Sequence, residues 1–500
     1  MASVITRRDF MKSVAAGCAA LSIPGIALAA EKPKMKRPNI VLITADDLNC
    51  DSVGVFGCKI SGITPNIDKL ASEGVRFAHA HVTIAVCQPS RSVLMTGRYP
   101  HRNGARGFEP IDPSVTTLQE RLRAAGYLNG IMAKNSHLQP VEKFCWDYVI
   151  AANQLEQGRA PSLYHSHAKA FFEQAKAAGK PFFLMANSQD PHRPFAGSDA
   201  EMNLFGKHMP YSRKVENSEA EVSGFLPDIP GVREEVAQYF TSVHRCDETV
   251  GEVLRALDET GNRENTLVMF LSDNGMSFPF AKTNCYLAST HTPWIARWPG
   301  RIKPGKVDGN HFISGIDYMP TIIEAAGLDK VSGMDGKSFH SILTGGRESG
   351  REHAFTCFEE TAGRNQYPMR CIQSTKYGYI YNAWSDGKTE FKNEAQGGMA
   401  WKAMLASTDP KVQARAEFFL YRTPEELYDL GSDPNCLVNL AEQPKHKYAK
   451  DGVLQDMRRL LLNNMAATKD PILEPFKAFI ATGKQTWQAE PKKKRKGAGG

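Results

Sequence analysis

The chain has 500 residues, 42% hydrophobic and 23% charged, which is the composition of a globular protein and not of a disordered chain. Its formal net charge of +7 lies at the two ends, because residues 1–12 carry +2 and the run from Lys492 to Lys496 carries +5. The neutral body excludes a broad nucleic-acid-binding face, so we expect no nucleic acid partner.

The first 30 residues are typical of an export signal. Arg7 and Arg8 open a twin-arginine pattern, and a weakly apolar stretch follows that ends in small residues near Ala29. We expect residues 1–30 to be a twin-arginine signal peptide, read by the twin-arginine export machinery, and the protein to be periplasmic or secreted. Lipid anchoring at Cys18 is the less favoured alternative.

Between residues 36 and 345, short apolar runs alternate with helical stretches. This pattern indicates an α/β fold with a large, mostly parallel sheet sandwiched by helices. Four runs end in polar residues: 39–45 before Asp46 and Asp47, 128–133 before Lys134, 182–186 before Asp190 and His192, and 266–271 before Asp273 and Asn274. Since ligands bind at the carboxyl ends of parallel strands, we expect one shared cleft.

The segment Cys87-Gln88-Pro89-Ser90-Arg91 predicts the start of a helix. Pro89 suits a first helical turn, because its φ is already helical and its missing N–H would have had no partner there. Cys87 then lies at the helix entrance, where free N–H groups and the helix dipole favour an anion. Arg91, one turn further on, adds a positive charge to the same face.

The pattern changes after about residue 345. Short strands are expected at 377–382 and 426–430, and a helix at 445–464. We interpret residues 346–484 as a smaller C-terminal subdomain with an antiparallel sheet. Residues 485–500 are expected to form a basic, disordered tail.

The C-x-P-S-R segment that begins at Cys87, followed by Thr-Gly-Arg at 96–98, resembles the signature of type I sulfatases of the alkaline phosphatase superfamily. In that family a formylglycine-generating enzyme oxidises the cysteine to formylglycine, whose hydrated aldehyde is the nucleophile. The resemblance implies an alkaline-phosphatase-like fold, with the catalytic domain at 36–345. It also implies a calcium ion, because the set of ligands is rich in oxygen. The implied ligands are Asp46, Asp47, the modified Cys87, Asp273 and Asn274.

The same resemblance implies the catalytic roles. Arg91 would hold the aldehyde hydrate, and Lys134 and Lys282 would grip the sulfate oxygens. His137 would take a proton when the aldehyde is regenerated. His192 would protonate the departing oxygen or nitrogen.

A finer resemblance, carried by residues 272–286, is to the heparan N-sulfatase (sulfamidase) branch. Departures at Ala133, Gln189 and Lys282, and one residue inserted before His137, leave N-sulfate and O-sulfate substrates both open. We expect a hydrolase that removes sulfate from a sulfated glycan, with a sulfated glucosamine as the first candidate. The alternatives are a phosphomonoester or phosphonate ester hydrolase of the same superfamily and a non-catalytic glycan-binding relative.

Overall fold

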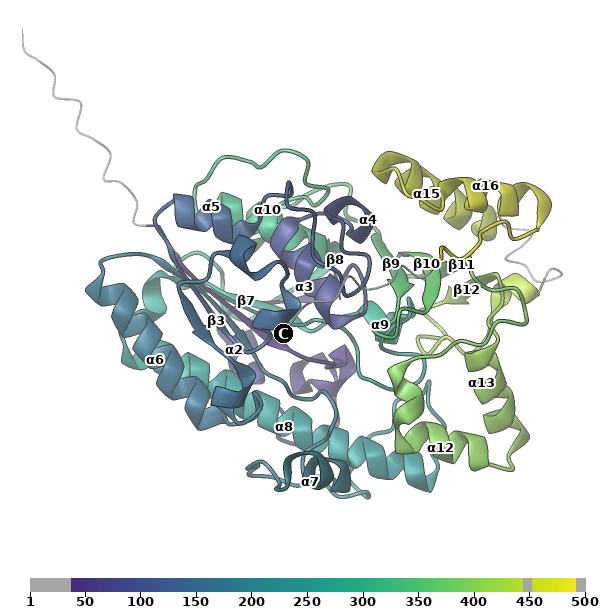
Figure 1. Cartoon of the computed structure of the whole chain (residues 1–500), viewed down its shortest axis with the longest axis horizontal. Coiled ribbons are helices and arrows are strands. Elements are labelled where there is room, and N and C mark those ends of the chain that lie inside the picture. The colour runs from purple at the N-terminus through teal and green to yellow at the C-terminus, as the bar shows by residue number, and fades with distance from the viewer. Residues whose placement is uncertain (1–36, 444–451, 492–500) are drawn as a thin grey trace, which may run out of the picture. The chain divides into compact units, whose positions relative to one another are not determined.

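The computed structural model describes residues 37–443 and 452–491, which form an eight-stranded sheet, a four-stranded sheet and the helices around them (Figure 1). The expected signal peptide with Cys18 and the lysine run at 492–496 lie outside the described residues. Among the helices of the described ranges, none combines the length and apolar character that a membrane crossing requires.

The larger sheet has the strand order β4-β3-β5-β1-β6-β7-β2-β8. Its strands are β1 (Asn39–Ala45), β2 (Val75–His81), β3 (Leu128–Met132), β4 (Tyr148–Ile150), β5 (Phe182–Asn187), β6 (Thr266–Ser272), β7 (Trp294–Arg297) and β8 (Lys306–Ser314). Strand β7 runs antiparallel to β6 and β2, whereas the other neighbouring pairs are parallel. The predicted mostly parallel sheet is therefore confirmed, with one reversed strand.

Helices cover both faces of this sheet. The helices of this part of the chain are α2 (Pro65–Ser72), α3 (Cys87–Thr96), α4 (Pro100–Asn103), α5 (Leu118–Ala124), α6 (Pro161–Ala177), α7 (Asp199–Phe205), α8 (Pro230–Glu259), α9 (Leu287–Thr290), α10 (Tyr318–Ala325) and α11 (His340–Leu343). Val41 and Ile43 of β1 enter a core shared with α2, α6 and α8, while Ile40 and Leu42 enter a second core with α3, α5 and α10. The two sets of helices lie on opposite sides of the sheet in Figure 1. Such double coverage explains why the strands are continuous apolar runs.

The C-terminal part contains the antiparallel sheet β12-β11-β10-β9. Its elements are β9 (Ala354–Glu360), β10 (Gln366–Gln373), β11 (Tyr377–Asn382), α12 (Met399–Ala406), α13 (Pro410–Leu420), β12 (Glu425–Asp429), α15 (Val453–Thr468) and α16 (Leu473–Thr482). The strands predicted at 377–382 and 426–430 correspond to β11 and β12. The expected helix at 445–464 corresponds to α15, which extends to Thr468, and residues 444–451 lie outside the description.

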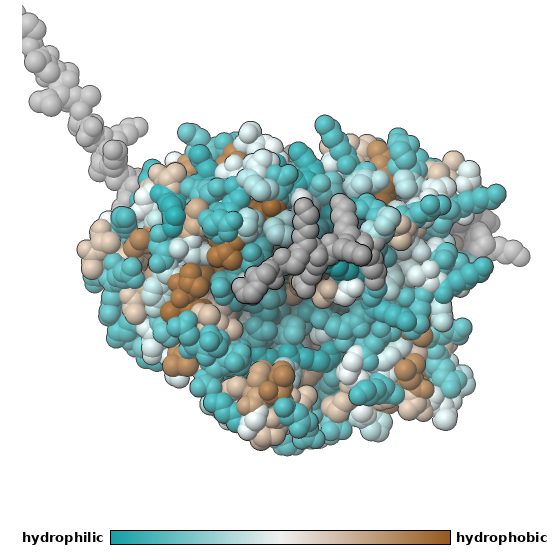
Figure 2. All heavy atoms as spheres, in the orientation of Figure 1, coloured by the Kyte–Doolittle hydropathy of each residue, from teal (hydrophilic) through white to brown (hydrophobic). Residues whose placement is uncertain are grey.

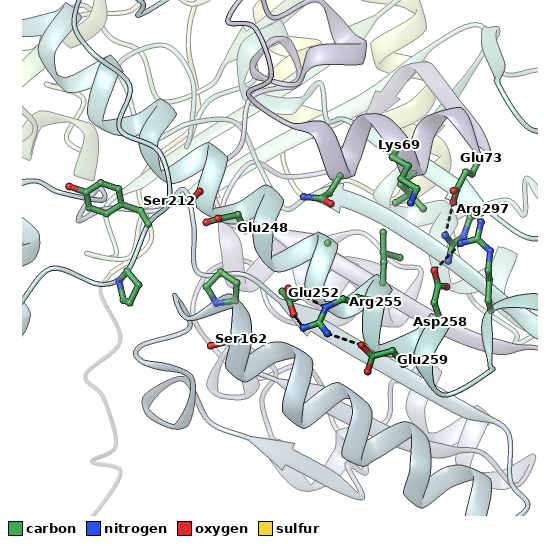
Figure 3. A pocket seen from close by; sticks show the side chains of 18 residues that line it. Lys69, Glu73, Ser162, Ser212, Glu248, Glu252, Arg255, Asp258, Glu259 and Arg297 are labelled. Atoms are coloured by element: carbon green, nitrogen blue, oxygen red, sulfur yellow. Dashed lines mark hydrogen bonds and ion pairs between the residues drawn. The ribbon is translucent and has the colours of Figure 1, made fainter.

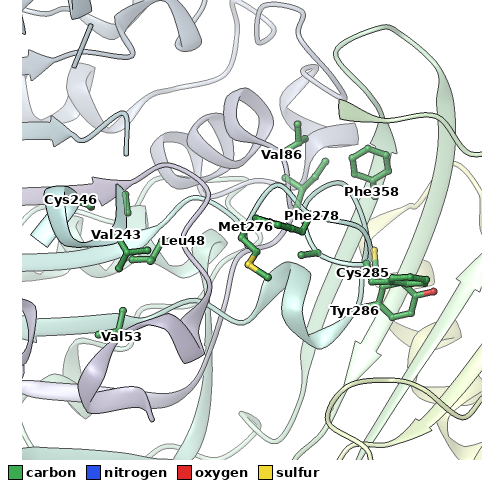
Figure 4. Packing of buried hydrophobic residues seen from close by; sticks show 14 of the residues in the cluster. Leu48, Val53, Val86, Val243, Cys246, Met276, Phe278, Cys285, Tyr286 and Phe358 are labelled. Atoms are coloured by element: carbon green, nitrogen blue, oxygen red, sulfur yellow. The ribbon is translucent and has the colours of Figure 1, made fainter. Parts of the chain in front are cut away.

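The first core includes residues of both sheets. In Figure 4, Met276 and Phe278, just after β6, lie between Leu48 and Val243 on one side and Phe358 of β9 on the other. The loop that follows β6 is thereby packed against the C-terminal sheet.

Residues 485–491, expected to begin the disordered tail, contact the C-terminal sheet. The Tyr381 hydroxyl donates to Gln485 Oε1 at 2.8 Å, and the Glu490 N–H donates to Gln366 Oε1 at 2.9 Å. Arg106 forms an ion pair with Glu490 at 3.0 Å.

Candidate active site

The structure brings the predicted site residues together at one edge of the larger sheet. Asp46 and Asp47 follow β1, Lys134 follows β3, and Asp273 follows β6. Strand β1 pairs in parallel with β5 on one side and with β6 on the other, so their carboxyl ends meet at the same edge. The residues that follow these strands therefore lie at the same edge of the sheet.

Cys87 is the first residue of α3, as the position of Pro89 predicts. The helix ends at Gly97, whose positive φ of 62° permits its N–H to bond Val93 O at 2.9 Å. The Cys87 side chain is buried, and this burial raises the pKa of its thiol to about 12, although the charge of Lys282 opposes the shift. The encoded thiol thus stays protonated at neutral pH and is a poor nucleophile.

Arg91 lies one turn after Cys87 and is completely buried. Its Nη2 donates to Asp273 Oδ2 at 2.7 Å, and its Nη1 donates to Thr44 Oγ1 at 2.8 Å and Asn187 Oδ1 at 2.5 Å. These three partners come from β1, β5 and the end of β6. The guanidinium is consequently a fixed positive charge at the base of the cluster.

Two buried lysines face the acidic residues. Lys134 forms an ion pair with Asp46 Oδ2, and its backbone takes a positive φ of 54°, an unusual conformation for a residue with a side chain. Lys282 lies 2.8 Å from Asp47 Oδ1 and 2.6 Å from Glu394 Oε1. The two ammonium groups and Arg91 make the cluster a candidate anion site.

The aspartates of the cluster perturb one another. Burial, followed by the charge of Asp46, raises the pKa of Asp273 to about 7. Burial also raises the pKa of Asp47 to about 7, against the opposing charge of Lys282. The pKa of Asp46 is held well below its usual value, because Lys134, His192 and Arg91 outweigh the effect of its burial. Asp47 and Asp273 are thus harder to ionise than free carboxyl groups, because each is buried close to another negative charge.

The donors fit a hard divalent cation. Asp46 Oδ1 and Asn274 Oδ1 are buried and have no hydrogen-bond partner among the described residues, which is costly unless a cation or water contacts them. Oxygens of Asp46 and Asp47 and a ring nitrogen of His192 lie within 4.8 Å of one another. Both oxygens of Asp273 are engaged, one by Arg91 and the other by the Asp47 N–H at 3.2 Å.

The two predicted histidines differ in how they are held. His192 Nδ1 lies 2.6 Å from Arg193 O and donates to it, which leaves Nε2, 3.9 Å from Asp47 Oδ2, facing the cluster. Burial and Lys282 lower its pKa to about 4. His137 ends a short 3-10 helix and packs edge-on against Phe108. Burial and the charge of Lys134 lower its pKa to about 3, so His137 is neutral.

Three residues of the cluster were not singled out from the sequence. Thr44 and Asn187 hold Arg91, and Glu394 holds Lys282. Asn187 carried a usable signal, because an amide at the end of a buried apolar run needs a polar partner. Glu394 lies in an irregular segment, and no local sequence pattern marked it as a site residue.

A larger hollow of about 830 Å³ lies elsewhere and contains none of the predicted site residues. This hollow lies along α8 and extends to Arg297. Arg297 pairs with Val268 near the start of β6, so the hollow is at the edge of the sheet opposite the carboxyl ends of the parallel strands. Its charged groups largely satisfy one another, as Figure 3 shows for Arg255 with Glu252 and Glu259. A hollow of about 300 Å³ is lined by Val86, which precedes Cys87, and by Glu394, which contacts Lys282.

Comparisons with known proteins agree with this site. A family model described as Sulfatase matches residues 38–328, and one described as N-sulphoglucosamine sulphohydrolase, C-terminal, matches residues 277–393. An "Ulvan-active sulfatase" of Formosa agariphila is 29% identical over 428 residues, 84% of this chain and 79% of its own length. The human "N-sulphoglucosamine sulphohydrolase" is 27% identical over 494 residues, 92% of this chain and 94% of its own.

Solved structures share the fold. One described as a complex with its substrate D-glucosamine-2-N,6-O-disulfate superposes with a TM-score of 0.65 at 20% identity, covering 87% of this chain and 99% of that one. The sulfatase model spans more than half of the chain and includes every predicted metal ligand and catalytic residue. The chain belongs to the sulfatase family.

Proposed function

We propose that this sulfatase removes sulfate from a sulfated glycan, with a sulfated glucosamine as the first candidate, through a formylglycine made from Cys87 and a bound calcium ion. The observation that carries the proposal is the cluster itself. A buried cysteine at a helix N-terminus adjoins three fixed cations and three buried aspartates. The printed names of the human relative and of the glucosamine disulfate complex support the sugar.

Calcium would be held by Asp46, Asp47, Asp273, Asn274 and the modified Cys87. The unpartnered oxygens of Asp46 and Asn274 fit this role, and so do the raised pKa values of Asp47 and Asp273, since a cation would favour their charged forms. When bound, the ion would polarise the sulfate oxygens, and the hydrated aldehyde would supply the attacking oxygen.

The residues of the chain would do the rest. Arg91, Lys134 and Lys282 bring fixed positive charge to a water-poor site, where it stabilises the charge that develops during cleavage. His192 offers Nε2 to the departing oxygen or nitrogen, and the bound anion favours its protonated form. The low pKa of His137 keeps that ring neutral and able to accept a proton.

The choice between N-sulfate and O-sulfate stays a proposal. The match of the N-sulphoglucosamine sulphohydrolase model to residues 277–393 supports N-sulfate. The departures at Ala133, Gln189 and Lys282 support O-sulfate as the second candidate. A phosphomonoester or phosphonate ester hydrolase is the alternative that the test below must reject.

Export belongs to the same proposal. The twin-arginine pattern at 1–30 supports passage of a folded protein to the periplasm or beyond, with modification by a formylglycine-generating enzyme in the cytoplasm beforehand.

The test is sulfate release from a panel of glycans by enzyme co-expressed with a formylglycine-generating enzyme. We expect glucosamine N-sulfate or 6-O-sulfate to release inorganic sulfate, measured by ion chromatography. The Cys87→Ala variant should lose about a thousandfold or more in rate. Faster hydrolysis of the matching phosphate esters would overturn the proposal. So would the absence of sulfate release from every glycan by enzyme whose Cys87 is fully converted.

A further inference from the structure

Glu394 belongs to the C-terminal part of the chain, yet its carboxylate contacts the catalytic cluster. Its Oε1 lies 2.6 Å from Lys282 Nζ, whose other partner is Asp47 Oδ1 at 2.8 Å. The Lys282 side chain is 1% exposed and that of Glu394 is 40% exposed, so the pair connects the buried cluster to its opening.

The neighbours of Glu394 hold it in place. Asn393 Nδ2 donates to Thr283 Oγ1 at 2.6 Å, which joins this segment to the residue after Lys282. The Asn393 N–H donates to Gln396 Oε1 at 3.0 Å, which closes the turn that begins at Glu394. Glu394 is therefore a positioned acid and not a freely moving surface residue.

Glu394 also lines the hollow of about 300 Å³ together with Val86 and Phe108. Val86 precedes Cys87, and Phe108 packs against His137. Thr283, which follows Lys282, lines the hollow too, so the lining includes Glu394 itself and the sequence neighbours of Cys87 and Lys282. Lys392 lines the hollow too, but its side chain is 61% exposed and forms an ion pair with Glu390 at 3.4 Å.

Glu394 adds one negative charge to a cluster whose other charged side chains balance one another in number. Arg91, Lys134 and Lys282 match the aspartates Asp46, Asp47 and Asp273 in number. The proposed calcium would add two positive charges, and Glu394 removes one of them. The remaining single positive charge matches a sulfate monoester, which is a monoanion.

Dianions fit this balance poorly. A phosphate monoester carries about −1.5 to −2 charges at neutral pH. Inorganic sulfate, the product of the reaction, is also a dianion. The Glu394 carboxylate is partly exposed, so water screens part of its charge, but beside a buried cluster its repulsion of an extra negative charge is stronger than it would be in bulk water.

We propose that Glu394 makes the site selective for monoanionic sulfuryl groups by repelling dianions, so that it disfavours phosphate monoesters and promotes release of the sulfate product. The proposal rests on the proposed function and names how its site distinguishes substrates. Selectivity of this kind depends on a repulsive element as well as on attractive ones.

The test compares Glu394→Gln with wild type, both carrying the converted Cys87 and calcium. Glutamine keeps the shape and a hydrogen-bonding oxygen but removes the charge. We expect the inhibition constant of inorganic sulfate to fall about tenfold, which corresponds to ~1.4 kcal/mol. The ratio of kcat/KM for an aryl phosphate to that for the matching aryl sulfate should rise by a similar factor, and Glu394→Asp should restore both values toward wild type.

Glu390→Gln is the matched control, because Glu390 is an exposed acid of the same segment that pairs with Lys392 and does not contact Lys282. It should change neither quantity. Tighter binding of a dianion cannot result from misfolding, so a destabilised variant would not imitate the expected result. An unchanged inhibition constant for inorganic sulfate would overturn the inference and leave the proposed function intact. So would a change confined to the KM of the sulfate ester substrate, which is the result expected if Glu394 binds a sugar hydroxyl. A wild-type preference for phosphate would overturn both.

Discussion

His192 is held so that only one of its ring nitrogens can take part in chemistry. Its Nδ1 donates to Arg193 O at 2.6 Å, which leaves Nε2 facing the cluster. The pKa of about 4 means that the free enzyme has few protonated His192 rings at neutral pH, and that the protonated fraction falls about tenfold for each pH unit above that value. Its contribution as an acid should therefore matter most for substrates whose leaving group needs the proton.

We predict that His192→Ala lowers kcat/KM by about 10²–10⁴-fold for sugar sulfates, whose leaving groups are poor, as is usual for the loss of a general acid. The loss with 4-nitrophenyl sulfate should be less than about tenfold, since nitrophenolate leaves without a proton. Initial rates with the two substrate classes measure this. Equal losses for both classes would show that His192 acts in binding and not as an acid.

The single residues of the site were predictable where a motif or a strand end marked them. Cys87 and Arg91 lie in a recognisable helix start, and Asp46, Lys134 and Asp273 each follow a buried strand. Thr44 and Glu394 could not be predicted in the same way. Each has its role through a contact with a residue distant in sequence, such as that between Glu394 and Lys282, and no local pattern records such contacts.

At the scale of elements, the strands leading to the site were the most predictable. The apolar run 39–45 is β1, and the run 266–271 is β6 with one added residue. Complete burial on both faces makes such strands uninterrupted hydrophobic runs. The reversal of β7 was not predictable, because a strand of four residues carries no local sign of its direction.

The end of β2 and the segment after α9 meet at two histidines, of which His81 is buried and His291 partly buried. His81 and His291 form an antiparallel bridge, and their rings lie 5.4 Å apart. Burial lowers the pKa of His291 to about 4, although a hydrogen bond to Ala78 O opposes the shift. Burial and the charge of His291 also lower the pKa of His81 well below its usual value.

We predict that this pair makes the fold sensitive to acid. The unfolded chain binds a proton at His291 near pH 6.5 and the folded chain only near pH 4, so stability is lost as the pH falls between these values. The loss from His291 at pH 5 should be about 2 kcal/mol relative to pH 7. Urea denaturation of wild type and His291→Gln at both pH values measures it. If the variant loses as much stability on acidification as wild type, His291 is not the sensitive group.

In the molecule as a whole, the larger sheet and the C-terminal sheet share one hydrophobic core. Met276 and Phe278 lie within it beside Lys282, and Glu394 approaches Lys282 from the C-terminal side. The alternation of apolar runs predicted the first sheet, and the short strands after residue 345 predicted the second. Neither pattern could predict that Glu394, in a short 3-10 helix of the C-terminal part, would contact the site, because that depends on how the two parts pack together.

The cluster of buried aspartates predicts that a divalent cation stabilises the folded protein. Calcium at 100 times its dissociation constant should stabilise the fold by about 2.7 kcal/mol, and a chelator should remove this gain. Thermal unfolding with calcium and with chelator measures the change in Tm. Asp46→Asn should reduce the shift, because it removes a charged oxygen that has no hydrogen-bond partner among the described side chains. An equal Tm under both conditions would argue against a cation at this site.

We propose that the nucleophile of this enzyme is produced from Cys87 after translation. Burial raises the pKa of the Cys87 thiol to about 12, so the encoded side chain is a weak nucleophile at neutral pH. Peptide mass spectrometry of active enzyme measures the claim directly. We expect a peptide in which Cys87 has lost its sulfur and two hydrogens and gained one oxygen. Fully active enzyme whose Cys87 peptide carries only an unmodified thiol would contradict it.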